Sequence, residues 1–486
     1  MALDLVALGG AVDRKREKPP IGGSAYGLVD WDTRSILLTD FGSYSLSLEE
    51  KEWQSAVVLS LEEKVPKYTE IAGRKIPVLP KIGPAFFSKD QENYLTPAKT
   101  DPFFPRSEIL GEMERIYVIG THAHADHIGG LVYLRKRYPK AQIFMTEPTL
   151  KLCMWSWRDS LKIARRESLS VFFTGWDVYD MAKSVTIVEQ SCDLELGPFR
   201  VRLNRSGHIL GGVNVLVSVK HLGGPRVFFT SDTSFEEQHT VAGAVLPHGV
   251  VDYVVSESTY AGKSGLSRKA VEDAFAHDVR ACLDGSGKVL CPALAIGRSL
   301  ELYAILEKHG ITELFDVFVD GAACQTAEIY TAFGAVTDSI RKSFVKRRRE
   351  REAVIQRQGP AVIIAPSGML AGGRAVEHAL HLAADPKNLI AFSSYQDPCS
   401  PGFRLLRLPI GQRVVFCEQP VEFNARVAEY KLSAHMNGDE LLRMIDTLKP
   451  ECTFLVHGEE RGMDSVISQS SRRVEKLFLN EPRQLA

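Results

Sequence analysis

The chain has 486 residues and a formal net charge of −1 at pH 7, so no overall field attracts nucleic acid and any basic surface must be local. Charged residues make up 24% and apolar residues 44%, which is ordinary for a folded protein and, at this length, indicates two or three domain-sized units. The 8 cysteines form no C-x-x-C pair, which argues against a thiolate zinc site, and a disulfide framework is not expected in so long a chain.

The first residues, MALDLVALGG, are mildly apolar, but Asp4 interrupts them and basic residues follow rather than precede them. This order is wrong for a signal peptide. No run of 18 apolar residues occurs, so no membrane span is predicted. We therefore expect a protein of the reducing cytoplasm.

The segment up to residue 261 predicts a mixed α/β domain with much antiparallel sheet. Apolar and polar residues alternate at 200–204 and again at 213–219, the period of a half-buried strand. Further strands are expected at Ile116–Ile119, Val227–Thr230 and Tyr253–Val255, and a helix at Gly129–Tyr138. The pattern is compatible with sheets packed face to face under outer helices. The stretch Ser45–Arg115 is poorly periodic and receives no assignment.

From about residue 262 the pattern changes to strand-then-helix units, which are typical of a parallel sheet. The expected strands are Lys288–Pro292, Leu314–Val319 and Ala361–Ala365, and the expected helices are Ser267–Leu283, Leu300–Lys308, Thr326–Ala332 and Ala371–Ala384. Short strands return from about residue 411, at Arg413–Cys417 and Thr453–Val456. We interpret residues 262–400 as a domain inserted into a first domain made of residues 1–261 and 401–486.

The stretch THAHADHIGG follows the expected strand at 116–119 and contains the pattern H-x-H-x-D-H. It places four potential metal ligands, His122, His124, Asp126 and His127, within six positions. The whole chain has only 13 histidines, so a polar turn rich in histidine by chance is a poor explanation. Imidazole and carboxylate groups suit zinc and related divalent metals.

Three more candidate ligands stand where an expected strand ends and a loop begins, the usual place for a site held by a rigid scaffold. They are His208 in RSGHILGG, Asp232 in FFTSDTS and His457 in FLVHGEE. The expected assignment is His122, His124 and His208 for one ion, Asp126, His127 and His457 for a second, and Asp232 bridging both. Two ions about 3.5–4 Å apart can hold a hydroxide nucleophile and clamp the attacking and leaving oxygens.

The ordered set of motifs resembles that of the metallo-β-lactamase-fold hydrolases. More narrowly, it resembles the β-CASP nucleases of the branch similar to the pre-mRNA cleavage-and-polyadenylation endonuclease, well over residues 116–486 and more loosely before them. The matching residues are Asp40 in ILLTDFG, the HAHADH cluster, His208, Asp232, Glu257 in VSESTY, His435 in LSAHMNG and His457. The insert carries CPALAIGRS and APSGMLAGGR, which resemble segments of the β-CASP cap.

This resemblance implies an αββα sandwich with an inserted α/β β-CASP domain, and two Zn²⁺ or other divalent ions. In the family, the residue matching Asp40 orients a ligand histidine. His435 is the candidate general acid for the leaving 3′ oxygen, and Glu257 would hold it and favour its protonated form. A capping or salt-bridge role is the alternative for Glu257. Ser433 is a candidate for holding a phosphate oxygen, with a simple turn serine as the alternative.

The chain departs from the family pattern after His435, because Asn437 stands where the family often has Asp. An amide adds no charge, so this position is not expected to shift the pKa of His435 through an electrostatic interaction. The later loop SYQDPCSPG also replaces a more glycine-rich form.

The inserted domain favours a nucleic-acid strand over a small molecule, because compact β-lactam or thioester hydrolases need no such cap. The segment Arg341–Arg357 has eight Lys or Arg residues against two Glu, and phosphate contacts from it would give salt-dependent binding. A solvated helix face is the alternative. Arg298 and Arg374 are further candidates for phosphate contacts. Within the resemblance, His457 and the spellings GHILGG and SESTY look like the RNA-processing members.

The sequence therefore predicts a zinc-dependent ribonuclease that cleaves single-stranded RNA and leaves a 5′ phosphate and a 3′ hydroxyl. Endonucleolytic action is favoured, and 5′ exonuclease activity and a homodimer stay open. DNA is the less favoured substrate, and no membrane partner is expected. The alternatives are a DNA or dual-specificity nuclease, a small-molecule metallo-hydrolase and an RNA-binding scaffold with a degenerate site. The intact ligand set argues against the scaffold, and the cap argues against the small molecule.

Overall fold

A computed structural model gives the fold of the chain. It describes residues 3–12, 23–43, 68–71, 74–77, 105, 108–166, 172–220, 223–263, 267–397, 400–416, 419–479 and 481–485. The basic loop at 13–20, and most of the unassigned stretch at 45–115, lie outside these residues. The chain divides into two compact units, one of Met1–Leu46, Phe86–Gly265 and Ala434–Ala486, the other of Ser47–Ala85 and Leu266–Ser433.

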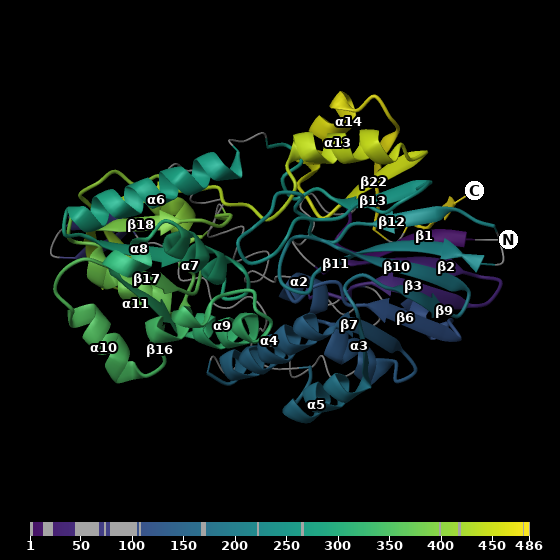
Figure 1. Ribbon diagram of the computed structural model, residues 1–486, viewed down its shortest axis with the longest axis horizontal. Coiled ribbons are helices and arrows are strands. Elements are labelled where there is room, and N and C mark those ends of the chain that lie inside the picture. Colours follow the sequence, from purple (N-terminus) through teal and green to yellow (C-terminus); the bar gives the residue numbers. More distant parts are fainter. Residues whose placement is uncertain are drawn as a thin grey trace. The chain divides into compact units, whose positions relative to one another are not determined.

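The first unit contains two seven-stranded sheets (Figure 1). One has the order β24-β1-β2-β3-β6-β7-β8. Its strands are β1 (Leu3–Gly9), β2 (Ala25–Asp30), β3 (Ser35–Thr39), β6 (Arg115–Ile119), β7 (Gln142–Thr146), β8 (Val185–Val188) and β24 (Arg483–Leu485). The other has the order β23-β22-β13-β12-β11-β10-β9. Its strands are β9 (Asp193–Leu196), β10 (Phe199–Arg205), β11 (Val213–Val219), β12 (Arg226–Phe229), β13 (Tyr253–Glu257), β22 (Cys452–Val456) and β23 (Val474–Lys476).

The two sheets pack face to face, because the apolar side chains on their inner faces form one core. Leu28, Leu37 and Ile119 of the first sheet meet Val215, Phe229 and Phe454 of the second in this core. The outer face of the second sheet is covered by α13 (Gly438–Leu448) and α14 (Glu460–Gln469), which share a second apolar cluster with its strands. The first sheet carries η2 (Glu108–Gly111), α2 (Ala125–Ile128), α3 (Leu131–Arg137), α4 (Glu147–Arg166) and α5 (Gly175–Ser184) in its connections. The predicted αββα sandwich is confirmed.

The second unit is built on a six-stranded parallel sheet of order β16-β15-β17-β14-β18-β21. The strands are β14 (Lys288–Pro292), β15 (Asp316–Asp320), β16 (Phe344–Val345), β17 (Ala361–Ala365), β18 (Leu389–Phe392) and β21 (Arg426–Glu429). The helices are α6 (Arg268–Asp284), α7 (Arg298–Lys308), α8 (Ile311–Leu314), α9 (Ala322–Ala332), η4 (Asp338–Ser343), α10 (Arg348–Gln356), α11 (Gly373–Leu382) and α12 (Pro401–Leu405). Two hairpins, β4–β5 (Tyr68–Ile71, Arg74–Pro77) and β19–β20 (Gln412–Phe416, Gln419–Phe423), complete the unit. The strand-then-helix pattern predicted from residue 262 is confirmed.

The end of the insert differs from the sequence interpretation. The sequence places it at residue 400, whereas the second unit continues to Ser433. The physical reason is that β21 pairs in parallel with β18 and extends the inserted sheet by one strand. The hairpin of β19 and β20 precedes β21, so the strand expected at Arg413–Cys417 lies in the second unit.

Candidate metal centre

The candidate ligands lie at one edge of the first unit, because the strands that carry them end there. In the first sheet β3 and β6 run parallel and end just before Asp40 and His122. In the second sheet β12, β13 and β22 run parallel and end at or just before Asp232, Glu257 and His457. The strand β10 runs in the same direction, since it is separated from β12 by the antiparallel β11, and it leads to His208.

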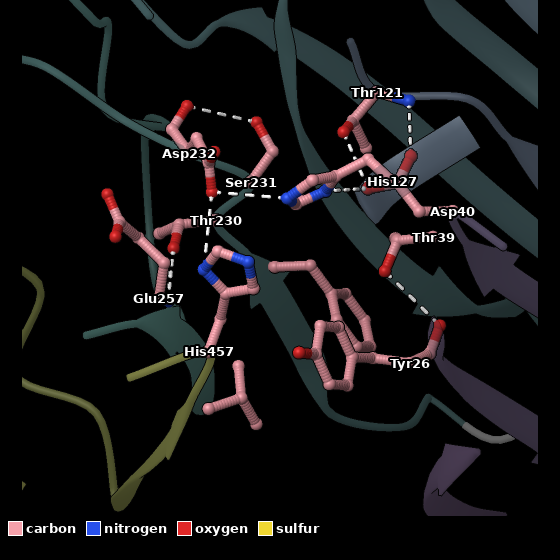
Figure 2. Close-up of a pocket in the computed structure, with 12 residues that line it drawn as sticks. Tyr26, Thr39, Asp40, Thr121, His127, Thr230, Ser231, Asp232, Glu257 and His457 are labelled. Atoms are coloured by element: carbon pink, nitrogen blue, oxygen red, sulfur yellow. Dashed lines mark hydrogen bonds and ion pairs between the residues drawn. The ribbon is translucent and has the colours of Figure 1, made fainter. Parts of the chain in front are cut away.

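The carboxylate of Asp232 lies at the centre of the cluster. Its Oδ2 is 3.4 Å from Nε2 of His122 and 3.5 Å from Nε2 of His208. Its Oδ1 is 3.3 Å from Nε2 of His127 and 3.6 Å from Nδ1 of His457, and Figure 2 shows these last two rings facing it. Asp232 is 2% exposed, so its two oxygens face these rings rather than water.

Two groups of ligand atoms meet around Asp232. His122, His124, His208 and Asp232 offer atoms within 4.8 Å of one another, and so do Asp126, His127 and His457. In the first group Nδ1 of His124 faces Nε2 of His208 at 3.0 Å. In the second, Nε2 of His457 is 3.2 Å from Asp126 Oδ2. The structure thus brings together all seven candidate ligands that the sequence suggested, in the grouping that the sequence suggested.

Several of the inward-facing atoms form no hydrogen bond with any of the residues that the structure describes. They are Nε2 of His122, of His124 and of His127, and Oδ1 of Asp232, all buried. A buried polar atom without a partner is costly, and a cation is the partner that several lone pairs can share. The chemistry of this donor set, imidazole and carboxylate, fits zinc. The residues therefore fit a divalent metal.

Neighbouring side chains fix the orientation of the rings. Nδ1 of His127 donates to Oδ2 of Asp40 at 2.8 Å, and the Thr121 hydroxyl donates to the same oxygen at 2.7 Å. Because the Thr121 hydroxyl proton is donated to Asp40, the hydroxyl oxygen accepts from Nδ1 of His122 at 3.2 Å. Nε2 of each ring is then left with a lone pair directed at Asp232. Asp40 thus lies against the ring of His127 (Figure 2), and it reaches the ring of His122 through the Thr121 hydroxyl.

His208 and His457 are held in the same way. Nδ1 of His208 donates to the carbonyl of Ala434 at 2.8 Å, which leaves Nε2 for the cluster. Gln238 Nε2 donates to the carbonyls of Gly207 and His208, both at 2.7 Å. The Thr259 hydroxyl lies 3.1 Å from Nδ1 of His457.

The protonation of the rings follows from burial and neighbouring charge. Burial lowers the pKa of His122 and His208, and it lowers the pKa of His124 to about 3. These three rings are therefore neutral at pH 7, the form that binds a metal. Burial also opposes charge on His127 and His457, but Asp232 and other carboxylates outweigh it and raise the pKa of both. Burial opposes the charged form of Asp232 too, and His127 and its neighbours nevertheless hold the pKa of that carboxyl well below its usual range.

The backbone of two site residues is in the left-handed region. Asp40 has φ 66° and His457 has φ 51°. Non-glycine residues adopt such angles at a cost of about 1–3 kcal/mol, and they cluster at functional sites. Gly207, just before His208, has φ 74°, and a Cβ there would lie 2.1 Å from the Ser234 carbonyl oxygen. Only glycine fits at this position.

Glu257 and His435 form a pair beside the cluster. Nδ1 of His435 lies 3.2 Å from both carboxylate oxygens of Glu257, and its Nε2 lies 4.0 Å from Oδ2 of Asp232. The backbone N–H groups of Thr233 and Thr259 donate to Glu257 at 3.0 and 3.2 Å. Burial lowers the pKa of His435, but Glu257, followed by Asp232, outweighs it and raises the pKa to about 9. Asn437 is the N-cap of α13 and accepts from the N–H of Glu440, so it serves the helix.

The candidates for phosphate contacts belong to the second unit. The Ser433 carbonyl accepts from Nη1 of Arg268 at 3.0 Å. Arg298 is the first residue of α7, and Nη1 of Arg374 on α11 lies 3.4 Å from Glu377. The role of these three residues stays a prediction.

The basic segment Arg341–Arg357 forms ion pairs within the second unit. Its paired residues are Arg341 and Lys346 with Glu328, Arg348 with Glu352, Arg351 with Asp320 and Arg357 with Asp316. Much of its charge is therefore matched by acidic neighbours, which favours the solvated-face interpretation for these residues.

The sandwich and its histidine–aspartate cluster define a metallo-hydrolase fold of the metallo-β-lactamase class. Three family models match the chain: the metallo-beta-lactamase superfamily at residues 114–276, the Beta-Casp domain at 299–405 and the Zn-dependent metallo-hydrolase RNA specificity domain at 420–469. The chain thus carries the domains of the β-CASP branch of that superfamily, and the resemblance read from the motifs is confirmed.

Curated relatives are similar to most of the chain. The transcription termination factor FttA of Methanocaldococcus jannaschii is 30% identical over 71% of this chain and 58% of its own length. The endoribonuclease YSH1 of Gibberella zeae is 25% identical over 75% of this chain and 50% of its own. The probable RNase MJ4 of M. jannaschii is 24% identical over 72% of this chain and 83% of its own length. The chain thus spans about three fifths or less of the first two relatives.

A solved structure shares the fold. A protein of unknown function from Enterococcus faecalis aligns over 100% of both chains with a TM-score of 0.57 at 11% identity. None of the helices in the described part combines the length and apolar character needed to cross a lipid bilayer.

Proposed function

We propose that the protein is a zinc-dependent ribonuclease that cleaves single-stranded RNA internally and leaves a 5′ phosphate and a 3′ hydroxyl. The observation that carries the proposal is the Glu257–His435 pair: Nδ1 of His435 is bound to Glu257, and Nε2 lies 4.0 Å from Oδ2 of the central Asp232. A metal site alone indicates hydrolysis, whereas a histidine held by a carboxylate beside that site adds a proton donor for a leaving oxygen.

The proposed ligands follow the two groups of the cluster. His122, His124 and His208 would hold one ion, Asp126, His127 and His457 a second, and Asp232 both. When bound, such ions activate a water molecule and neutralise charge on the phosphate oxygens. Asp40, Thr121 and the Ala434 carbonyl hold the ligand rings in place through the bonds described above.

His435 has the role of general acid. Its Nδ1 is bonded to Glu257, so Nε2 is the atom that faces Asp232 and would donate a proton to the leaving 3′ oxygen. Two backbone N–H groups hold Glu257 in place. The His435 ring therefore cannot rotate without breaking its bonds to Glu257. Geometry of this kind raises the rate by about 10²- to 10⁴-fold in general acid catalysis.

RNA is the proposed substrate because of the domain and the relatives that the chain matches. Residues 420–469 match an RNA specificity domain, and two of the similar proteins carry the names endoribonuclease and RNase. No comparable observation favours DNA.

The test uses the full chain, zinc, and single-stranded RNA and DNA of one sequence, each labelled at the 5′ end. We expect internal RNA fragments that disappear with chelator and return with zinc, and slower or no DNA cleavage. Release of labelled mononucleotides alone would overturn the internal mode. DNA cleavage at an equal or higher rate would overturn the RNA preference. Asp232→Asn is the control for contaminating nuclease. If wild type shows no chelator-sensitive cleavage of either polymer, or no more than Asp232→Asn shows, the nuclease activity itself would be overturned.

A further inference from the structure

A buried amide on β11 lies behind the metal cluster. Asn214 is 1% exposed, and it belongs to a strand whose alternate residues, Val213 and Val215, point into the core between the sheets. Asn214 is therefore on the outer face of the sheet, where the next residue of that face, Leu216, packs in the cluster covered by α13 and α14. A buried polar side chain in such surroundings needs a partner.

Its partners are in the turn that carries Asp232. The backbone N–H of Ser231 donates to Asn214 Oδ1 at 2.9 Å. The hydroxyls of Thr233 and Ser231 lie 2.9 and 3.3 Å from the same oxygen. An amide oxygen has two lone pairs, so the N–H and one hydroxyl satisfy it. The pairing of β11 with β12 ends at Val215 and Phe229, so Asn214 supplies an acceptor where the ladder stops.

The turn held by Asn214 reaches both halves of the site. Asp232, between Ser231 and Thr233, faces His122 with Oδ2 and His127 with Oδ1; Figure 2 shows the contact with His127. The N–H of Thr233 donates to Glu257 Oε1 at 3.0 Å. The carbonyl of Thr233 accepts from the N–H of Met436, the residue after His435, at 2.6 Å. This turn thus carries the central carboxylate of Asp232, and it contacts both Glu257 and the loop of His435.

We propose that Asn214 is a further positioning residue of this centre: its carbonyl oxygen sets the Ser231–Thr233 turn, and through it the place of Asp232 among the histidines and of Glu257 beside His435. The expected effect of an Asn214 substitution on metal affinity can be measured without any substrate. Only its expected effect on turnover rests on the proposed function. Partners behind a metal ligand typically change metal affinity by about 10- to 100-fold when removed.

The experiment compares Asn214→Leu, which keeps the size of the side chain but removes the acceptor, with wild type. Asn388→Leu is the matched control, because Asn388 is also buried, accepts a backbone N–H at 2.8 Å, and lies in the second unit. Zinc affinity is measured by competition with a chromophoric chelator without RNA, folding by circular dichroism, and kcat and KM on RNA separately.

We expect Asn214→Leu to bind zinc about 10- to 100-fold more weakly and to lose kcat with little change in KM, and Asn388→Leu to keep wild-type zinc affinity even with a lower Tm. If folded Asn214→Leu binds zinc as wild type does, or if both variants lose affinity equally, the proposal is overturned. Should Asn214→Leu not fold, Asn214→Ala decides by the same measurements. A wild type that binds zinc but cleaves no RNA would refute the proposed function and leave the zinc comparison valid.

Discussion

Asp40 accepts a hydrogen bond from Nδ1 of His127 at 2.8 Å, and this contact ties the end of β3 to the metal cluster. Both carboxylate oxygens are used, since the N–H of Thr121 donates to the other oxygen at 2.7 Å. Asp40 also has the left-handed φ of 66°, a strained angle that these bonds compensate. If the cluster holds a metal, the carboxylate would act on it through the rings that it orients.

Asp40→Asn is expected to weaken zinc binding by about 10- to 100-fold. The amide has one acceptor oxygen where the carboxylate has two, so one of the donors from Thr121 or His127 meets an NH₂ group instead. Chelator competition checks this, with Asp30→Asn as control. Asp30 is a buried carboxylate of the same sheet that accepts from the Thr33 hydroxyl at 2.7 Å, and it pairs with Ser35, at the opposite end of β3 from Asp40. Equal zinc affinity of Asp40→Asn and wild type would refute the orienting role.

His435→Ala is expected to keep its zinc and to lose activity by about 10²- to 10⁴-fold, because the ring supplies a proton and no ligand. Zinc per chain is measured by elemental analysis and turnover on labelled RNA. Loss of one equivalent of zinc would make His435 a ligand instead. Glu257→Gln is the comparison variant. Its amide oxygen can still accept from Nδ1 of His435, but the negative charge is lost, so its activity should fall between those of wild type and His435→Ala.

The candidate ligands could be predicted from the sequence because each follows a strand with a clear apolar pattern. The four of H-x-H-x-D-H lie within six positions, and His208, Asp232 and His457 follow short apolar runs. Apart from Asp40, which the family resemblance supplied, the residues behind them could not be predicted. Thr121, Gln238 and Asn214 act through bonds to other strands, and these depend on a register that one strand does not reveal. On an alternating strand the polar position of Asn214 would be expected to face solvent, whereas α13 and α14 cover that face.

The same limit explains the misplaced end of the insert. The strand β21 has the sequence RVAE, with two partly exposed and two exposed residues, as an edge strand does. It lacks the apolar run by which β14 and β17 were recognised. Only its pairing with β18 assigns it to the second unit.

Removal of the metal is expected to lower Tm, because cations bind the folded cluster and not the unfolded chain. At free zinc of about 100 times Kd the stabilisation is about 2.7 kcal/mol. Differential scanning calorimetry of chelated and zinc-restored protein measures it. His122→Ala/Asp232→Ala is the control, since its Tm should no longer respond to zinc. A Tm of wild type that is unaffected by chelation would contradict the metal site.

The buried ion pair of the second unit gives a pH-dependent prediction. Arg351 donates two hydrogen bonds to Asp320, at 2.6 and 2.7 Å, and His378 contacts the same carboxylate at 2.8 Å. Burial raises the pKa of Asp320, but the hydrogen bonds of His378 and Arg351 outweigh it, so the pKa is lowered overall. A lowered pKa means that the pair stabilises the fold above the unfolded value of about 4, and that this stabilisation is lost as pH falls through the folded value.

Arg351→Met is therefore expected to cost about 3–5 kcal/mol at pH 7, because it leaves a buried carboxylate without its cation. The difference in Tm from wild type should be largest at pH 7 and shrink as the pH falls towards the lowered pKa of Asp320 in wild type, because a protonated Asp320 no longer requires the arginine. Arg341→Met is the control from the same basic segment. Its guanidinium is 45% exposed and pairs with Glu328, so its removal should cost less than about 1 kcal/mol. Equal Tm losses in the two variants at pH 7 would show that Arg351 serves the surface charge of the segment and not the buried carboxylate.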